Sequence, residues 1–325
     1  MRLPTNKEAT FTMKIPNWLA KVRLKPDVHA PAAQPFTPTP TAQTGIKTVA
    51  LGGATTMLEG NADDPYFQAI EHHAAMLDGL AALAARHVPR TGSVIDVGAN
   101  IGLSTILLAR LAGHVTAYEP SPPNAALLRR NLERNGITNV TIRTAAASSA
   151  PGTLRFHVAA FGAGSHVVAA GHVAGERIET VNVPAVTLDE AELQSGRPIA
   201  FIKIDAEGHE PNVLAGARRL LARDRPLVFT EVNLWCLSAF AGHSPGAFVR
   251  TLWQAFEVSR PGPDGGTEPI DDAYVFLHDL IVFHGGMTDI VLRPREGVAM
   301  PSLPCLSWPE AALAALRAVG ADVDG

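Results

Sequence analysis

The residues best suited to chemistry stand at the ends of two neighbouring strand-like segments. Asp96 ends the segment "VIDVG", and Gly98 and Gly102 bound the turn "GANIG" that leads into an apolar helical segment. Glu119 ends the next strand-like segment, "VTAYEP". Glycine lets the backbone turn sharply and lets a ligand approach it closely. Because ligands of open α/β sheets bind beyond the carboxyl ends of the strands, we expect these residues to form a binding site.

The types and spacing of these residues indicate a nucleoside ligand with positive charge and no phosphate. Glu119 stands where an acidic side chain accepts hydrogen bonds from both ribose hydroxyls. A pyrophosphate favours Gly-x-Gly-x-x-Gly, whereas Asn100 stands within this turn. We expect the carboxylate of Asp96 to point at the ligand, where it would repel a pyrophosphate and attract an ammonium or a sulfonium. The predicted cofactor is therefore S-adenosylmethionine. A turn whose glycines serve packing alone is the alternative.

A second group of acids ends a later apolar segment, "IAFIKIDAEGHE". Because side chains alternate along a strand, Lys203, Asp205 and Glu207 share one side until the turn begins. Glu231 ends the following apolar segment, "PLVFTE". In one interpretation, Lys203 forms an ion pair with the acids and orders the turn. In the other, the acids lie beside the reacting group, and Asp205 also contacts the cofactor.

These acids could support two kinds of catalysis. A carboxylate of Asp205, Glu207 or Glu231 could take the proton of a hydroxyl acceptor. The three together could instead hold a divalent cation such as Mg²⁺, which would lower the pKa of that hydroxyl. His166, in the loop segment "GAGSH", is a further candidate base, although a lone histidine in a loop is commonly just solvated.

Alternating apolar and helical segments must position these residues. Strands are predicted at "SVIDVG", "HVTAYEP", "VTIRTAAAS", "IAFIKIDAEG" and "PLVFTEVN", with helical segments between them. Such apolar strands indicate a mostly parallel sheet with helices on both faces. We expect a helix over residues 64–88, an antiparallel excursion formed by "LRFHVA" and "VNVPAVTL", and a late strand at "DLIVFHG".

The chain divides into a tail and one folded domain. Residues 1–45 are rich in Pro, Thr and Ala and lack hydrophobic periodicity, which predicts a disordered N-terminal tail. Residues 46–325 are predicted to form the domain, with a C-terminal helix at about 308–319 that covers the sheet or one of its edges.

Composition narrows the class of protein. The chain has 325 residues, of which 46% are hydrophobic, a net charge of −4 and two cysteines. The slight negative charge gives no case for binding nucleic acid along a broad surface. A membrane span needs about 20 apolar residues in a row, and no stretch approaches this. We therefore expect a cytoplasmic protein without a transmembrane segment or disulfides. The sequence does not determine the oligomeric state, and a homo-oligomer is one of the alternatives.

Four segments together resemble the FkbM family of S-adenosylmethionine-dependent methyltransferases: "VIDVGANIGLSTILLAR", "YEPSPPNAALLRRNLERNG", "VTLDE" and "FIKIDAEGHEPNVLAGA". The resemblance covers about residues 64–232. It implies a Rossmann-like class I methyltransferase fold, with a mostly parallel sheet of seven strands, and methyl transfer, usually to a hydroxyl oxygen. Many methyltransferases place an acid near the adenine amino group. The matching stretch here is "TAAASS", so we expect backbone groups and Ser148 to hold the adenine.

The leading hypothesis is therefore an O-methyltransferase that acts on a hydroxyl of a sugar or polysaccharide precursor, or of a small natural product. A nicotinamide-dependent oxidoreductase would share the ribose-binding acid, but it favours a Gly-x-Gly turn and a hydride-transfer set such as Tyr–Lys. A non-catalytic, methyltransferase-like module is the third alternative. The intact set of Asp96, Gly98, Gly102 and Glu119 argues against lost cofactor binding.

Overall fold

The computed structural model describes residues 43–158, 165–167 and 180–298. The first described strand begins at Thr44, within the last residues of the predicted tail 1–45. The rest of that tail and the expected C-terminal helix at 308–319 lie outside the described residues.

The central sheet has eight strands in the order β13-β12-β14-β11-β10-β3-β4-β5. Their bounds are β3 (Ser93–Val97), β4 (His114–Tyr118), β5 (Val140–Arg143), β10 (Ile199–Ile204), β11 (Leu227–Asn233), β12 (Phe256–Pro261), β13 (Thr267–Pro269) and β14 (Met287–Pro294). The five strands from β5 to β11 are parallel, whereas β14 runs antiparallel to both β11 and β12. This confirms the predicted fold class. The expected count of seven strands is one too low, because the short β13 pairs with the outer edge of β12.

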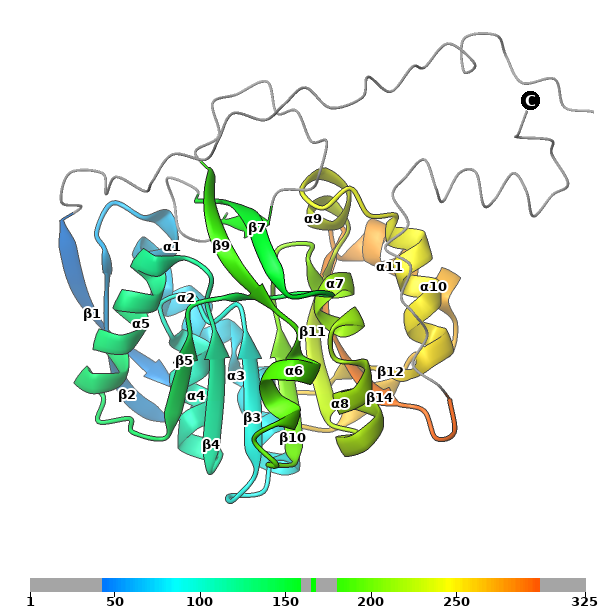
Figure 1. Ribbon diagram of the computed structural model, residues 1–325, viewed down its shortest axis with the longest axis horizontal. Coiled ribbons are helices and arrows are strands. Elements are labelled where there is room, and N and C mark those ends of the chain that lie inside the picture. The colour runs from blue at the N-terminus through cyan, green and yellow to red at the C-terminus, as the bar shows by residue number, and fades with distance from the viewer. Residues whose placement is uncertain (1–42, 159–164, 168–179, 299–325) are drawn as a thin grey trace, which may run out of the picture.

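Helices cover both faces of this sheet (Figure 1). Their bounds are α1 (Pro65–Gln68), α2 (Ile70–Met76), α3 (Asp78–His87), α4 (Leu103–Leu111), α5 (Pro122–Arg134), α6 (Leu188–Leu193), α7 (Glu210–Ala215), α8 (Arg218–Asp224), α9 (Leu234–Ala239), α10 (Pro245–Ala255) and α11 (Ala273–Phe283). Alternate strand residues enter opposite cores: Val94 and Phe201 pack with α1–α5, whereas Ile95 and Ile202 pack with α6–α11. Apolar burial on both faces explains the near-continuous apolar strands.

An N-terminal hairpin and three short helices precede β3. The hairpin pairs β1 (Thr44–Leu51) with β2 (Ala54–Asn61), and Glu59 ties it to α5 through ion pairs with Arg130 and Arg134 at 2.9 and 2.8 Å. The helix expected over residues 64–88 is present as three successive segments, α1, α2 and α3. The side chain of Asp64 caps α1 by accepting the Tyr66 amide hydrogen. The hairpin of β1 and β2 was not predicted from the sequence.

A smaller sheet lies over the carboxyl ends of the central strands (Figure 1). It contains β6 (Ala146–Ala147), β9 (Thr180–Val186), β7 (Gly152–His157) and β8 (His166–Val167), in that order. β7 and β9 pair antiparallel, which confirms the predicted excursion. This small sheet therefore covers the carboxyl ends of the central strands, where a ligand is expected to bind.

The strand predicted at residues 279–285 is wrong, because this segment belongs to α11. The Asp272 side chain accepts the amide hydrogens of Tyr274 and Val275 and so begins a helix. Phe276 and Leu280 then pack one turn apart against the sheet. A short apolar run fits a helix or a strand equally well by composition. The last long strand is instead β14.

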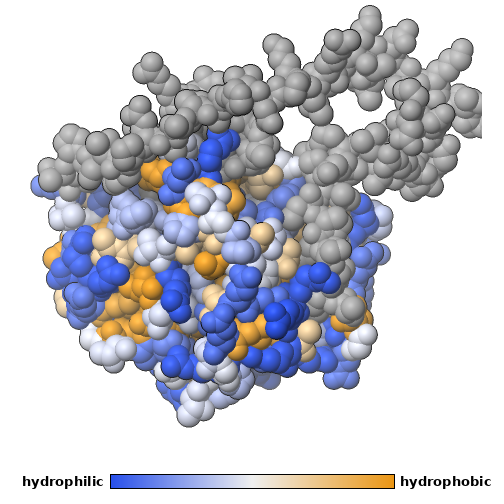
Figure 2. All heavy atoms as spheres, in the orientation of Figure 1, coloured by the Kyte–Doolittle hydropathy of each residue, from blue (hydrophilic) through white to orange (hydrophobic). Residues whose placement is uncertain are grey.

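Hydrophilic side chains cover much of the face seen in Figure 2, with apolar residues gathered in a few places among them. No helix in the described ranges 43–158, 165–167 and 180–298 is both long and apolar enough to cross a membrane.

Candidate active site

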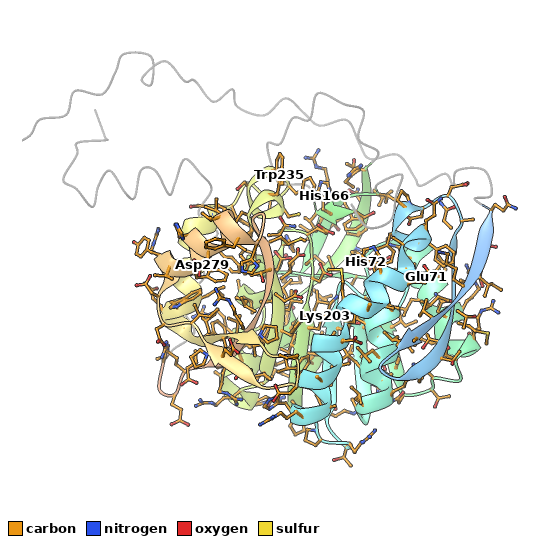
Figure 3. The ribbon with its side chains drawn as sticks, turned by 180° about the vertical axis from the view of Figure 1, so that it is seen from behind. Glu71, His72, His166, Lys203, Trp235 and Asp279 are labelled. Atoms are coloured by element: carbon orange, nitrogen blue, oxygen red, sulfur yellow. The ribbon has the colours of Figure 1, made fainter. Side chains whose placement is uncertain are left out.

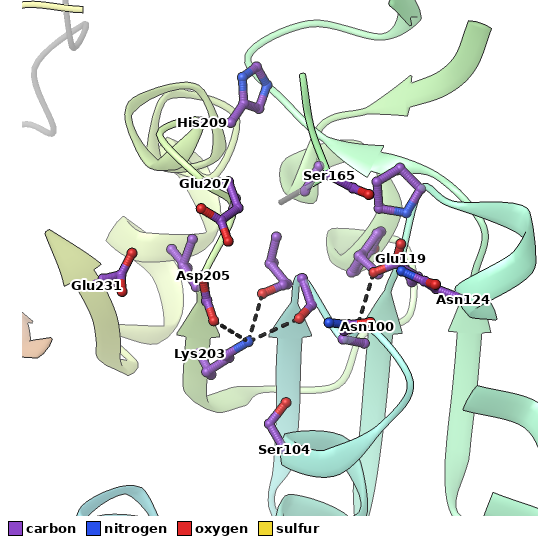
Figure 4. Close-up of a pocket in the computed structure, with 18 of the residues that line it drawn as sticks. Asn100, Ser104, Glu119, Asn124, Ser165, Lys203, Asp205, Glu207, His209 and Glu231 are labelled. Atoms are coloured by element: carbon purple, nitrogen blue, oxygen red, sulfur yellow. Dashed lines mark hydrogen bonds and ion pairs between the residues drawn. The ribbon is translucent and has the colours of Figure 1, made fainter. Parts of the chain in front are cut away.

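A cavity of about 330 Å³ opens at the carboxyl ends of the central strands. Its lining comes from the ends of β3, β4, β10, β11 and β14, from α1, α2, α4 and α5, and from the small sheet above. Figure 4 shows its polar side chains in two groups: Asn100, Glu119 and Asn124 on one side, and Asp205, Glu207 and Glu231 on the other. A volume of this size suits a small organic ligand.

The glycine turn depends on two different close contacts. Gly98 has a φ of +78°, and a Cβ atom there would collide with the Asp205 carbonyl oxygen. Gly102 has a φ of +104°, and a Cβ atom there would lie 2.6 Å from Leu128 Cδ1 in α5. Only Gly98 lines the cavity. Gly102 therefore allows the turn to pack closely against α5 and does not face the cavity. The expectation that both glycines contact the ligand is wrong for Gly102.

Glu119 lies at the cavity wall and also holds the turn. Its Oε2 accepts the Asn100 amide hydrogen and its Oε1 accepts the Ser121 amide hydrogen, both at 2.8 Å. The side chain is 4% exposed, and burial raises its pKa to about 7, against the lowering effect of these two hydrogen bonds. A carboxylate has more acceptor positions than these two bonds use. Glu119 can therefore accept further hydrogen bonds from a ligand.

Asn100 carries an unsatisfied atom beside Glu119. Its backbone φ of +48° is one that asparagine tolerates better than most residues. Its Oδ1 atom is buried and has no hydrogen-bond partner among the described residues, and the residue lines the cavity. Buried polar atoms are normally hydrogen-bonded. The atom therefore marks a place where a ligand donor fits.

Asp96 does not line the cavity, which corrects the expectation that it points at the ligand. The residue is fully buried, and its Oδ2 accepts hydrogen bonds from Ser104 and Thr105 at 2.9 and 2.6 Å. Its Oδ1 lies 3.4 Å from Lys203 Nζ, which stands directly opposite on the neighbouring strand. Asp96 therefore anchors the start of α4 and holds the buried lysine.

Lys203 links the glycine turn after β3 to Asp205, which directly follows β10. Its ammonium donates to the Val97 and Gly98 carbonyl oxygens at 3.3 and 3.1 Å and lies 3.6 Å from Asp205 Oδ2 (Figure 4). Burial alone would lower its pKa, but the Asp96 and Asp205 carboxylates raise the pKa above its usual value. The lysine is therefore a fixed cation whose hydrogen bonds are already used inside the protein.

Four acidic side chains line the other part of the cavity: Asp205, Glu207, Glu231 and Asp289. Burial, reinforced by the Asp205 charge, raises the pKa of Glu207 to about 7 and of Asp289 to about 6. The same causes, with Glu207 added, raise the pKa of Glu231 to about 9. Asp205 itself is about half-exposed. The structure thus brings together all three acids predicted as catalytic candidates.

Glu207 adopts a strained conformation within this group. Its φ of +52° lies in the left-handed region, which costs a non-glycine residue about 1–2 kcal/mol. Cys236 in α9 donates its thiol hydrogen to Glu207 Oε2 at 3.1 Å. Strain of this kind persists where the surroundings over-determine it, often at functional sites. Glu207 therefore has a fixed place and a carboxyl pKa near neutrality.

Ser148 faces a buried network rather than the cavity, which corrects its assignment to the adenine site. The Asn212 amide nitrogen lies 3.1 Å from His209 Nδ1 and 3.1 Å from His243 Nε2. Because that amide only donates, His209 accepts through Nδ1 and donates from Nε2 to Ser148 Oγ at 3.0 Å. Burial lowers the pKa of His209 to about 3, so the ring is neutral. The network joins β6 to α7.

His166 does not line the cavity, whereas its neighbours Ser165 and Val167 do. Its ring stacks on Phe240 with centroids 3.8 Å apart and meets His157 edge-on at 4.9 Å. Figure 3 shows it near the edge of the molecule beside Trp235, away from Lys203. Strand alternation in β8 turns the ring away from the cavity. The prediction of His166 as a base over the pocket is therefore not supported by its position.

The geometry does not support the metal alternative. Within the described residues, no group of three or more His, Cys, Asp or Glu side chains is arranged to hold a metal ion. The carboxylates of Asp205, Glu207 and Glu231 share the cavity without forming such a cluster. We therefore derive no step through a metal.

Several cavity residues were missed from the sequence. Asp289 lies on β14, which the sequence did not predict as a strand, and Tyr66 and His73 lie on α1 and α2, within the helix expected over residues 64–88. Phe156 and the stretch Ala145–Ala147 add apolar side chains to the cavity lining. The alternating pattern "MTDIVL" before Pro294 was the one signal that could have placed Asp289 on a strand.

We expect the free protein to lose stability as the pH rises from 6 to 9. The folded-state pKa values of Glu119 and Glu210 are raised to about 7 and that of Glu231 to about 9, mainly by burial. A raised folded pKa favours folding below the unfolded value, and this contribution disappears as the pH passes the folded pKa. The slope is at most about 1.4 kcal/mol per pH unit for each such carboxyl. Urea unfolding across this range measures it.

The variant Glu231→Gln should flatten this slope between pH 7 and 9, because the amide does not titrate. The exposed Glu257 of β12 provides the control, and Glu257→Gln should leave the slope unchanged. A wild-type stability that rises over the same pH range would contradict the raised pKa values.

Part of the chain that lines this cavity is similar to a known family. Residues 96–254 match the family model of the methyltransferase FkbM domain. No curated protein matches the chain. Among solved structures, methyltransferase FkbM from Methylobacillus flagellatus KT is 16% identical, with a TM-score of 0.35, over 62% of this chain and 44% of that one. This chain thus matches less than half the length of that protein.

Two further solved structures are similar at 12% identity. A putative methyltransferase from Streptococcus mutans in complex with SAH has a TM-score of 0.38 and covers 66% of this chain and 96% of its own. A rRNA methylase from Streptococcus thermophilus has a TM-score of 0.37 and covers 67% and 95%.

Proposed function

We propose that this chain, which carries a methyltransferase FkbM domain at residues 96–254, is an S-adenosylmethionine-dependent O-methyltransferase. Its acceptor is a hydroxyl group of a sugar or polysaccharide precursor, or of a small natural product. Methyl transfer follows from the family match. The cofactor and the hydroxyl acceptor rest on the charge and geometry of the cavity.

The observation that carries the proposal is the charge of the cavity lining. Among the described residues, five carboxyl groups face the cavity, whereas the one lysine that lines it is held by the neighbouring strands. These carboxyl groups belong to Glu119, Asp205, Glu207, Glu231 and Asp289. Opposite charges attract strongly where water is partly excluded, and like charges repel. The lining therefore favours positively charged groups over a pyrophosphate, and Glu119 and Asp205 are the carboxyl groups that we assign to the sulfonium cofactor.

The residues at the glycine turn fit this cofactor. Glu119 has acceptor capacity left for ribose hydroxyls, and the buried Asn100 Oδ1 offers an acceptor to a ligand donor. The absent side chain at Gly98 leaves room for the Asp205 backbone to close the turn. Ala146 and Phe156 present an apolar wall that suits an adenine ring. In place of Ser148, this wall is our candidate for the adenine contact.

Bound S-adenosylmethionine supplies an electrophilic methyl group. The chain has to hold the acceptor hydroxyl in line and take its proton. Glu207 is our candidate base, because a carboxyl with a pKa of about 7 is ionised in part at neutral pH and is still basic. Asp205 is held by Lys203, and Glu231 has a pKa of about 9, so each is less suited to accept this proton.

The cofactor separates this proposal from its alternatives. Isothermal calorimetry should show S-adenosylhomocysteine binding, and no heat with NAD⁺ at equal concentration. A nicotinamide-dependent oxidoreductase would give the opposite result, and a non-catalytic module without a cofactor site would bind neither. An RNA acceptor would appear as labelled methyl groups in RNA added to the enzyme, which we do not expect from a chain with a net charge of −4.

We expect Glu119→Gln to weaken S-adenosylhomocysteine binding at least tenfold while the protein stays folded. The amide removes the charge behind hydrogen bonds that are each worth about 1.5–3 kcal/mol. It also leaves one of the Asn100 and Ser121 amides without an acceptor. Calorimetry measures the affinity, and the exposed Glu133 of α5 gives a matched control in Glu133→Gln. Unchanged affinity would remove Glu119 from the cofactor site.

A further inference from the structure

We propose that the methyl acceptor carries a protonated amino group, which binds between Glu231 and Asp289 at the β11–β14 end of the cavity. This inference rests on the proposed function and adds the chemical class of its substrate: a hydroxylated amine, such as an amino sugar.

Glu231 and Asp289 stand directly opposite each other on neighbouring antiparallel strands. Their side chains point to the same face of the sheet, and both line the cavity. Residues paired in this way have Cβ atoms about 4.5–5.5 Å apart. Like charges in this arrangement destabilise a sheet. Neither carboxylate forms an ion pair with any described residue of the chain.

The charge of the methyl donor leaves this pair without a positively charged partner, although Glu231 has a side-chain hydrogen bond with Asn233. S-adenosylmethionine has a net charge of one positive unit, and Glu119 and Asp205 already stand at the turn that we assign to it. Lys203 is occupied by Asp96, Asp205 and two carbonyl oxygens. A cation brought by the acceptor would therefore be the first one available to Glu231 and Asp289.

The surroundings of the pair favour an organic cation. Phe229 and Met287 line the same cavity, so an aromatic and an apolar side chain accompany the two acids. Phe229 lies two residues before Glu231 and Met287 two before Asp289, which puts all four on one face of the sheet. Aromatic rings combined with carboxylates are the setting in which proteins bind alkylammonium groups. A divalent metal would need a cluster of donors, which the described residues do not provide here.

The location also suits the reaction. Glu207, our candidate base, lies in the same cavity, and Asp205 and Glu207 act electrostatically on Glu231. An ammonium held at Glu231 and Asp289 would leave a hydroxyl of the same molecule to reach Glu207. The amine therefore positions the acceptor, and the hydroxyl oxygen receives the methyl group.

Matched acceptors test this inference. Glucosamine, galactosamine and kanamycin are each compared with their N-acetylated forms, which keep hydroxyls but lose the positive charge. With labelled S-adenosylmethionine, we expect at least one amine to have a kcat/KM at least tenfold above that of its N-acetylated form. Calorimetry with kanamycin, using protein saturated with S-adenosylhomocysteine, gives a readout independent of activity.

Two variants test whether the amino group of the acceptor binds at Glu231 and Asp289. Asp289→Asn and Glu231→Gln should each weaken kanamycin binding at least tenfold and bring the amine-to-acetamide ratio of kcat/KM toward one. The affinity for S-adenosylhomocysteine should change less than threefold. Glu257→Gln, which alters an exposed acid on β12 outside the cavity, is the matched control and should change none of these values.

The outcomes separate this inference from the proposed function. Binding of S-adenosylhomocysteine combined with equal or faster methylation of the N-acetylated forms overturns the amine subsite and leaves the methyltransferase intact. Binding of S-adenosylhomocysteine without any heat from kanamycin or transfer to the amines also overturns it. Failure to bind S-adenosylhomocysteine overturns the proposed function. Kanamycin titrated into the free protein and into Asp289→Asn then still decides whether the cation subsite exists.

Discussion

Replacing Glu207 by glutamine should lower kcat at least 100-fold, measured as transfer of labelled methyl groups to the best acceptor of the hydroxylated panel described above. The amide cannot accept the hydroxyl proton, and general base catalysis contributes about 10²–10⁴-fold. The shape of the side chain is kept, and the glutamine oxygen can still accept the Cys236 thiol hydrogen. Affinity for S-adenosylhomocysteine should therefore stay within about threefold of the wild type.

The pH profile gives this prediction a second readout. The base has to be ionised, so the wild-type kcat should be low at pH 5.5 and rise to a plateau above the Glu207 pKa of about 7. Glu190→Gln, at an exposed acid of α6, should keep both the rate and the profile. If Glu207→Gln methylates at the wild-type rate, Glu207 is not the base.

Replacing Gly98 by alanine should destabilise the protein by at least about 2 kcal/mol and abolish measurable S-adenosylhomocysteine binding. A left-handed conformation costs a non-glycine residue about 1–2 kcal/mol, and the new Cβ would also collide with the Asp205 carbonyl oxygen. The collision would push β10 and the loop after it away from β3. Urea unfolding and calorimetry measure the two effects.

Gly53 separates the two causes. It has almost the same φ, +77° against +78°, but a Cβ atom there would meet nothing within 4 Å. Gly53→Ala should therefore cost only the conformational penalty of about 1–2 kcal/mol and leave binding unchanged. Equal losses in the two variants would show that the close approach of Asp205 does not matter.

The sequence by itself determined the layers of the fold and the edge where the site lies. Apolar runs such as "SVIDVG" and "FIKI" are buried on both faces, so their composition already indicated a parallel sheet under two layers of helices. Glycine turns and strand ends are local features of the sequence. From them we predicted Gly98, Glu119, Asp205 and Glu207 at the carboxyl edge of the sheet, and all four line the cavity there. Local patterns are enough wherever the neighbours along the chain fix the geometry.

Only the tertiary structure decided which way individual side chains face. Asp96 was expected at the ligand, but pairing of β3 with β10 brings Lys203 opposite it and draws its carboxylate beneath the turn. His166 turns away from the cavity and packs on Phe240, because its neighbours Ser165 and Val167 face the cavity. Such outcomes depend on strand register, which sequence periodicity within one strand does not reveal.

The acidic pair of Glu231 and Asp289 shows the same limit most clearly. The two residues are far apart in the chain, and Asp289 followed a segment predicted as a strand that folds as α11. Helix capping by Asp272 and packing of Phe276 and Leu280 decide that segment. β14 then inserts between β11 and β12 and brings Asp289 opposite Glu231. The site's charge is thus a product of sheet topology, because strands distant in sequence meet there only after folding.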